Sequence, residues 1–174
     1  MRRREFLVRS ATAAGAVWLS SQSIFKAIAD QTLPRKFAAT DTVTLGSTTL
    51  VAHLTPGHTR GCTTWTLKVP DAGRTYDVVI IGSLGVNPGF QLVNNKDVPQ
   101  IAEEYARAFK TSRALPCDIP LGSHPGMYNM AEKYAKLGKG GANPYLDPAG
   151  YKAELDLDEA MYHAVLEAQT KAAK

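Results

Sequence analysis

The first residue whose position could support chemistry is a histidine in a tight turn between two stretches with a β pattern. His58 follows Pro56, which fixes φ at the entrance of the turn, and Gly57 and Gly61 permit backbone angles that other residues avoid. The imidazole is therefore expected to occupy a defined position. A metal ligand needs such a position, and a structural histidine is the alternative interpretation.

Two further polar residues lie where predicted strands end. His124 stands between Ser123 and Pro125, and Ser83 lies in a glycine-containing loop. Loops at strand ends often carry functional groups, and zinc sites in hydrolases use about three protein ligands per metal, mostly histidine with Asp or Glu. Ser83 could contact a substrate or be an ordinary turn serine. Of the other histidines, His53 is expected to be structural and His163 to be solvated on a terminal helix.

The elements that must position these residues follow from the hydrophobic pattern. Strands are predicted over residues 42–45, 48–54, 62–69, 76–81 and 117–121, and helices over 98–111, 127–137 and 148–172. Gly46 and Ser47 form a two-residue hairpin signal, and Asp97 is a plausible helix cap. Strands followed by helices predict an α/β (α+β) fold with one mostly antiparallel sheet covered by helices.

Composition limits the class of protein. The 174 residues suit one domain, with 44% apolar and 21% charged residues. The net charge of +4 owes much to the arginines at positions 2, 3, 4 and 9, so the remainder is near neutral and lacks the basic stripe of a nucleic-acid-binding protein. Cys62 and Cys117 show no zinc-finger spacing; they are either small core residues or a disulfide pair.

Residues 1–29 have the pattern of a targeting segment that precedes a domain over residues 30–174. A basic start is followed by a short apolar run and by an A-x-A cleavage site at residues 27–29. Residues 3–7 resemble the twin-arginine export signal of bacteria, which implies a periplasmic or secreted protein. The apolar run is too short for a stable membrane span. An amphipathic helix of the mature fold is the alternative.

Three segments of the domain resemble one enzyme family. The runs AHLTPGHTRGCTTW (residues 52–65), IGSLGVNPGF (81–90) and PCDIPLGSHPG (116–126) look like the class B metallo-β-lactamases of the third subclass, B3. The resemblance begins near Pro34 and covers the C-terminal half of that family's domain. It implies half of an αββα sandwich, in which the metal site lies in the groove between two similar halves.

The resemblance also implies roles for individual residues. His58 matches the histidine that completes the first zinc site, and His124 matches the histidine of the second, so the implied cofactor is zinc, with up to two ions. Ser83 matches a serine that assists substrate binding, and Gly85 stands where some members have a second serine. In the family, a zinc-bound hydroxide attacks the carbonyl of a β-lactam substrate.

The family's HxHxDH metal motif does not occur in this sequence, because its four histidines are widely spaced. Impaired or absent activity is therefore expected, together with an exposed inner sheet face that favours self-association or a complementary N-terminal half. Two alternatives stay open. One is a non-catalytic remnant or partner half-domain, and the other is a lactone or thioester hydrolase of the same superfamily.

Overall fold

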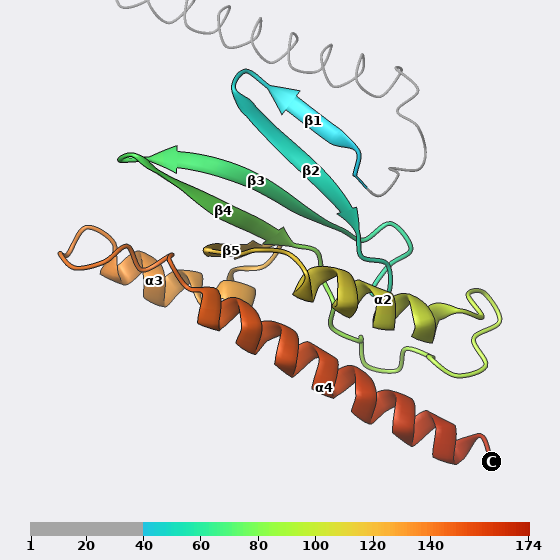
Figure 1. Ribbon diagram of the computed structural model, residues 1–174. Helices are drawn as coiled ribbons and strands as arrows, with labels where there is room; N and C mark the ends of the chain where they lie inside the picture. Colours follow the sequence, from blue (N-terminus) through green and yellow to red (C-terminus); the bar gives the residue numbers. More distant parts are fainter. Residues whose placement is uncertain (1–39) are drawn as a thin grey trace, which may run out of the picture. The chain divides into compact units, whose positions relative to one another are not determined.

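A computed structural model describes residues 40–174, so the predicted leader over residues 1–29 lies outside the described residues. The described part contains a five-stranded sheet with the strand order β1-β2-β3-β4-β5 (Figure 1). Strands β1 to β4 pair antiparallel in sequence order, and β5 pairs parallel with β4. The strands are β1 (Thr42–Leu45), β2 (Thr48–Leu54), β3 (Thr63–Asp71), β4 (Arg74–Ile81) and β5 (Ile119–Gly122).

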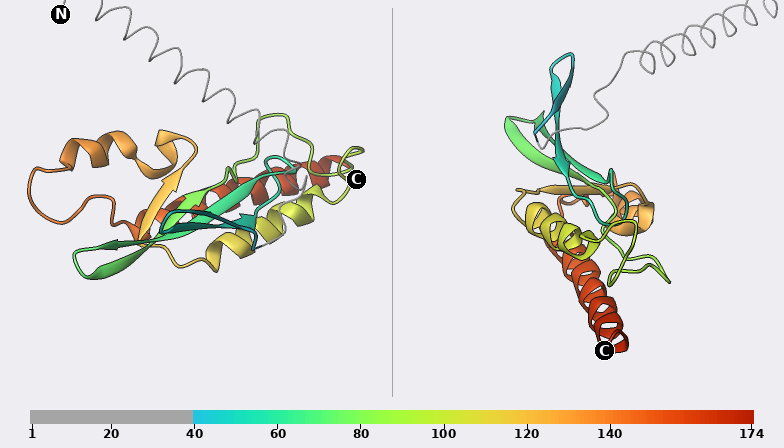
Figure 2. Two further views of the ribbon diagram at one scale, coloured as in Figure 1. Left: turned by 90° about the horizontal axis from the view of Figure 1, so that it is seen from above. Right: turned by 90° about the vertical axis from the view of Figure 1, so that its right-hand side faces the viewer.

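The helices gather mostly on one side of this sheet. They are α2 (Ile101–Arg113), the short 3-10 helix η1 (Pro125–Tyr128), α3 (Met130–Lys136) and α4 (Pro148–Ala172). Two further views show α2 and α4 side by side below the strands, whereas the β1–β2 hairpin extends away from them (Figure 2). The predicted fold class, a mostly antiparallel sheet covered by helices, is confirmed. Among residues 40–174, no helix combines the length and the apolar character needed to cross a membrane.

The predicted hairpin and strand faces agree with the observed register. Leu45 pairs with Thr48, so Gly46 and Ser47 form the two-residue turn, and Gly46 adopts a φ of +60°. Trp65 pairs with Ile80 in the neighbouring strand. Because side chains alternate along a strand, the predicted separation of apolar and polar residues in β3 places them on opposite faces of the sheet.

The core lies between one sheet face and helices α2 and α4. Tyr105 of α2 stacks on Tyr162 of α4, with ring centroids 5.5 Å apart. The Tyr162 hydroxyl also donates to the carbonyl of Ala102, and the Tyr151 hydroxyl donates to the carbonyl of Ser112, so that both tyrosines tie α4 to α2. The buried cluster consists of Val79, Ile81, Leu84, Val86, Leu92, Ile101, Tyr105, Ala108, Phe109, Tyr151, Leu155 and Tyr162.

The opposite side of the sheet is mostly apolar, with Thr48, Thr63, Asp71 and Arg74 as its polar members, and we call its apolar residues the apolar sheet face. Val79 and Ile81 point toward the helices, so the alternate residues of β4 and their partners in the register point away from them. On its outer strand, Val43 is 46% exposed and Leu45 is 82% exposed. The apolar sheet face comprises Val43, Leu45, Leu50, Ala52, Leu54, Trp65, Leu67, Val69, Tyr76, Val78, Ile80, Ile119 and Leu121.

Two predicted helix boundaries are wrong. Helix α2 begins at Ile101, with Gln100 and not Asp97 at the cap position and no side-chain cap bond. Asn95 instead accepts hydrogen bonds from the backbone N–H groups of Asp97 and Val98, and thereby forms a turn before the helix. The helix predicted over residues 127–137 is divided into η1 and α3, because Asn129 adopts a left-handed φ of +52° between them.

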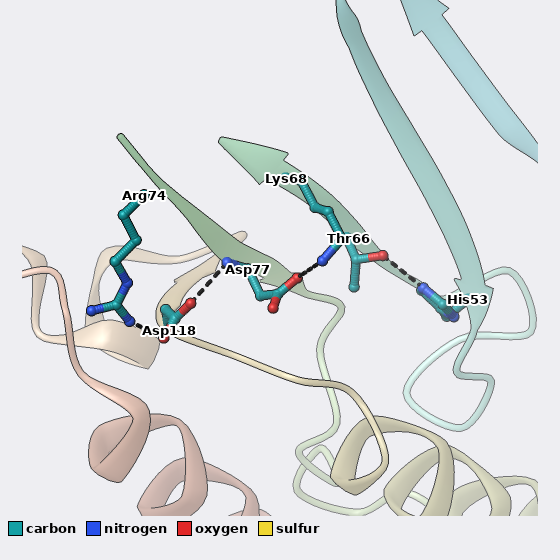
Figure 3. Close-up of polar contacts among 6 residues, drawn as sticks. All are labelled: His53, Thr66, Lys68, Arg74, Asp77 and Asp118. Carbon is teal, nitrogen blue, oxygen red and sulfur yellow. Dashed lines mark hydrogen bonds and ion pairs between the residues drawn. The ribbon is translucent and has the colours of Figure 1, made fainter. Parts of the chain in front are cut away.

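On the sheet face toward the helices, polar residues of neighbouring strands contact each other (Figure 3). His53 Nε2 lies 2.8 Å from Thr66 Oγ1, and burial lowers the pKa of this histidine. Farther along, Lys68 contacts Asp77, and the Asp118 carboxylate accepts from the Asp77 backbone N–H at 3.0 Å. The His53 side chain therefore links β2 to β3, in agreement with its predicted structural role.

Candidate functional site

The loops that carry the predicted site residues leave the same edge of the sheet. Strands β2, β4 and β5 run in one direction, so their carboxyl ends meet at this edge. The turn with His58 follows β2, the loop with Ser83 follows β4, and His124 follows β5. The sheet topology therefore brings together three loops that are far apart in the sequence.

Buried hydroxyl groups join the strand ends beneath these loops. Thr55 Oγ1 and Thr64 Oγ1 lie 3.1 Å apart, and both residues are fully buried. Thr64 Oγ1 also accepts a hydrogen bond from the backbone N–H of Gly82 at 3.1 Å. A Cβ at position 82 would lie 2.7 Å from the Thr63 carbonyl oxygen, so only glycine permits this approach. The starting points of the His58 turn and the Ser83 loop are thus fixed relative to each other.

The turn itself rests on an aromatic ring from α2. Gly57 has a φ of +153°, and a Cβ at this position would lie 2.8 Å from Cγ and Cδ1 of Tyr105. Tyr105 is only 1% exposed and belongs to the core cluster. Because the ring cannot move without disturbing the core, it supports the backbone next to His58.

One carbonyl group determines the orientation of the His58 imidazole. The Gly85 carbonyl oxygen lies 2.7 Å from His58 Nδ1 and accepts a second hydrogen bond from Tyr105 Oη at 3.2 Å. A carbonyl oxygen can only accept, so Nδ1 carries a proton, and in the neutral form of the ring the lone pair is on Nε2. Metal-ligating histidines usually have such a partner on the second ring nitrogen, because it fixes both tautomer and ring orientation.

An acidic residue of α4 lies beside this arrangement. A Cβ at position 85 would be 3.4 Å from Asp158 Oδ1, which places the carboxylate next to the Gly85 backbone. Burial raises the pKa of Asp158, whereas the nearby His58 imidazole acts in the opposite direction. Asp158 therefore lies close enough to His58 to affect the electrostatic environment of the imidazole.

The other two predicted site residues are less constrained. His124 is exposed, and its carbonyl accepts from the backbone N–H of Met127 at 3.1 Å at the start of η1. The Ser83 carbonyl accepts a contact from Cys62 Sγ at 3.1 Å. Within residues 40–174, no hydrogen bond joins the side chains of His58, Ser83 and His124. The structure thus brings the three residues to one edge and holds only His58 in a fixed orientation.

The sequence pattern predicted a defined position for His58 but missed the residues that orient its ring. Tyr105 is a buried residue of α2, and an apolar position on a helix indicates core packing without indicating a role at a distant turn. Gly85 acts through its carbonyl group, which has no side-chain signal in a sequence. Cys62 and Cys117 are free, half-buried thiols, and burial raises the pKa of Cys117 to about 12.

Solved structures of bacterial enzymes are similar to this chain, although no protein-family model matches it. The FEZ-1 metallo-β-lactamase from Legionella gormanii is 48% identical with a TM-score of 0.75, over 77% of this chain and 51% of that chain. BJP-1, a subclass B3 metallo-β-lactamase of Bradyrhizobium japonicum, is 33% identical with a TM-score of 0.73, over 81% of this chain and 53% of that chain. The chain matches about half of the subclass B3 metallo-β-lactamase fold, in sequence and in structure.

A third similar structure is that of a di-zinc enzyme. The class B3 di-zinc metallo-β-lactamase LRA-12 from an Alaskan soil metagenome is 29% identical with a TM-score of 0.68, over 76% of this chain and 50% of that chain. The metallo-β-lactamase half-domain thus spans about half the length of the solved structures that it matches.

The side chains of this metallo-β-lactamase half-domain do not by themselves fit a catalytic zinc site. Such sites use about three protein ligands per metal and an open position for water. Within residues 40–174, no three His, Cys, Asp or Glu side chains come together in a way that could hold a metal ion. All four histidines of the sequence fall in this range, at positions 53, 58, 124 and 163. Any metal site at His58 would need ligands beyond those that the described residues bring together.

Proposed function

We propose that the chain is one half of an exported, zinc-dependent β-lactam hydrolase. In this proposal His58 and His124 are metal ligands and Ser83 contacts the substrate. The observation that carries the proposal is the hydrogen bond between His58 Nδ1 and the Gly85 carbonyl, because it fixes the imidazole and leaves Nε2 as the ring nitrogen that can bind a metal. The position of Ser83 and His124 at the same sheet edge supports it further.

The proposal includes a complementary N-terminal half that carries an HxHxDH motif. The ligand count supports this requirement, since the described half-domain brings no three metal-binding side chains together. The apolar sheet face offers the surface on which such a half would pack. Stacked sheets bury their apolar faces against each other about 10 Å apart, which would place metal ligands from both halves along one groove. Alone, the chain is expected to have little or no activity.

Two other functions make different predictions. A non-catalytic partner half-domain would use the apolar sheet face for association and would leave His58 without a role in turnover. A lactone or thioester hydrolase would use the same metal ligands on a different acyl substrate. The 48% identity to FEZ-1 favours the β-lactam substrate over the other acyl groups.

Hydrolysis of a carbapenem by the full chain tests the proposal. The chain is assayed with excess zinc, alone and with a separately expressed N-terminal half that contains HxHxDH. We expect turnover only in the mixture, abolished by a chelator. The mixture with His58→Ala should be at least about 100-fold slower, because loss of a direct ligand should cost no less than loss of its hydrogen-bond partner.

The matched control is His163→Ala, which removes an exposed histidine of α4 away from the candidate site. It should hydrolyse the carbapenem at the parent rate. If the His58 variant keeps the parent rate while the mixture is active, His58 is not a metal ligand and the proposal fails. Faster turnover of a lactone or thioester than of the carbapenem would show that the chain belongs to a lactone or thioester hydrolase instead.

A further inference from the structure

A cavity of about 530 Å³ lies between α3, the glycine-containing turn that follows it and the start of α4. The backbone N–H of Asp147, which lines the cavity, donates to the carbonyl of Asp118 just before β5, whereas His124 follows the other end of that strand. None of the residues to which the proposed hydrolase function assigns a role lines this cavity.

A buried ammonium group lines this cavity. The Lys133 side chain is only 9% exposed, and its Nζ lies 2.8 Å from Asp147 Oδ2. The ammonium group carries three N–H donors, and among residues 40–174 the Asp147 carboxylate is the one partner found for it. The contact holds the pKa of Asp147 below its usual range. A buried ammonium with unsatisfied N–H donors is costly, and an additional acceptor in the cavity would offset that cost.

The rest of the lining has the charge and shape for an anionic ligand. Lys136 and Lys139 also line the cavity, so three ammonium groups face two carboxylates, those of Glu132 and Asp147, and the lining carries a net charge of +1. Lys136 pairs with Glu132 at 2.6 Å, with both side chains well exposed. Gly140 completes the wall with a φ of +87°, and no atom lies within 4 Å of where its Cβ would be.

We propose that this cavity is a binding site for a small oxyanion, a carboxylate or a phosphate, held by Lys133 with Lys136 and Lys139. Oxyanions match the chemistry of the lining, because each oxygen can accept charge-assisted hydrogen bonds from ammonium groups. The buried Lys133 supplies a donor in a fixed position, whereas the two exposed lysines can adjust their side chains to contact the ligand. The site would operate without zinc and without a complementary half-domain.

Titration of the full chain with inorganic phosphate, and separately with succinate, tests this site. Amide resonances are followed in the presence of a chelator, with sodium chloride at matched ionic strength as the reference. We expect saturable shifts of the amides of Lys139 and Gly140 with at least one of the two anions, and none with chloride. Phosphate alone would assign a phosphoryl ligand, and succinate alone would assign a carboxylate.

Variants that replace exposed lysines by neutral glutamine test the site without disturbing the fold. Lys136→Gln combined with Lys139→Gln alters only exposed side chains and should weaken binding at least tenfold. Lys171→Gln is the matched control, since Lys171 is also exposed and pairs with an acid four residues before it, Glu167. It should bind like the parent, as should His58→Ala. Shifts no larger than those with chloride, or equal affinity in the double variant, would overturn the proposal.

Discussion

Replacement of Gly57 by alanine is expected to lower the free energy of unfolding by about 2–5 kcal/mol, the sum of overpacking and backbone strain. The added Cβ would lie 2.8 Å from the Tyr105 ring, closer than side-chain atoms approach each other. Tyr105 is 1% exposed and contacts other aromatic residues, so the ring has little room to move. Urea unfolding of the full chain, followed by circular dichroism, measures the change.

Gly61→Ala is the matched control for this prediction. Gly61 lies in the same turn, is exposed, and has no atom within 4 Å of its Cβ position. Its substitution should change the free energy of unfolding by no more than about 0.5 kcal/mol. Equal stability of both variants would mean that the Gly57–Tyr105 contact does not hold the turn.

Truncation of Tyr105 to alanine is expected to destabilise the half-domain by about 3–5 kcal/mol. The ring packs between α2, α4 and the His58 turn, so its removal would leave a cavity in the core. Tyr105→Phe keeps the ring and removes only the hydrogen bond to the Gly85 carbonyl, which should cost about 1 kcal/mol. Thermal and urea unfolding of both variants separates ring packing from the hydroxyl contribution.

Tyr134→Ala provides the reference for a tyrosine outside the core. Its side chain on α3 is 69% exposed, so its loss should alter stability by no more than about 0.5 kcal/mol. A Tyr105→Ala variant as stable as this reference would contradict the assignment of Tyr105 to the core. A Tyr105→Phe variant as unstable as Tyr105→Ala would instead place most of the stabilisation in the hydroxyl group.

Local patterns were sufficient to predict the elements whose boundaries depend on nearby residues. The hairpin at Gly46 is confirmed, since a two-residue turn is determined by its own backbone conformation. Helix α4 is observed over the predicted range, from Pro148 to Ala172. Asp97 was wrong as a cap because Asn95 competes for the backbone N–H groups just before α2. Such competition between neighbouring polar side chains is not resolved by propensity alone.

The site was predictable only in part, for a related reason. The glycines around His58 indicated a fixed turn, and the strand pattern placed three loops at strand ends. The partner of His58 could not be predicted, because it is a backbone carbonyl 27 residues away, at Gly85. The support by Tyr105 depends likewise on how α2 packs against the turn. Contacts of this kind follow from the tertiary fold, which local sequence patterns do not specify.

The orientation of the His58 imidazole is the central claim, and nitrogen NMR of the histidine side chains tests it most directly. The full chain is labelled at the imidazole nitrogens, His58→Gln assigns the resonances, and the exposed His163 serves as the solvent reference. We predict a proton on Nδ1 of His58, which the hydrogen bond to the Gly85 carbonyl requires, and an Nε2 resonance that shifts when zinc and the complementary half are added. A neutral His58 ring protonated on Nε2, or an Nε2 resonance unchanged by zinc in the active mixture, would contradict the account.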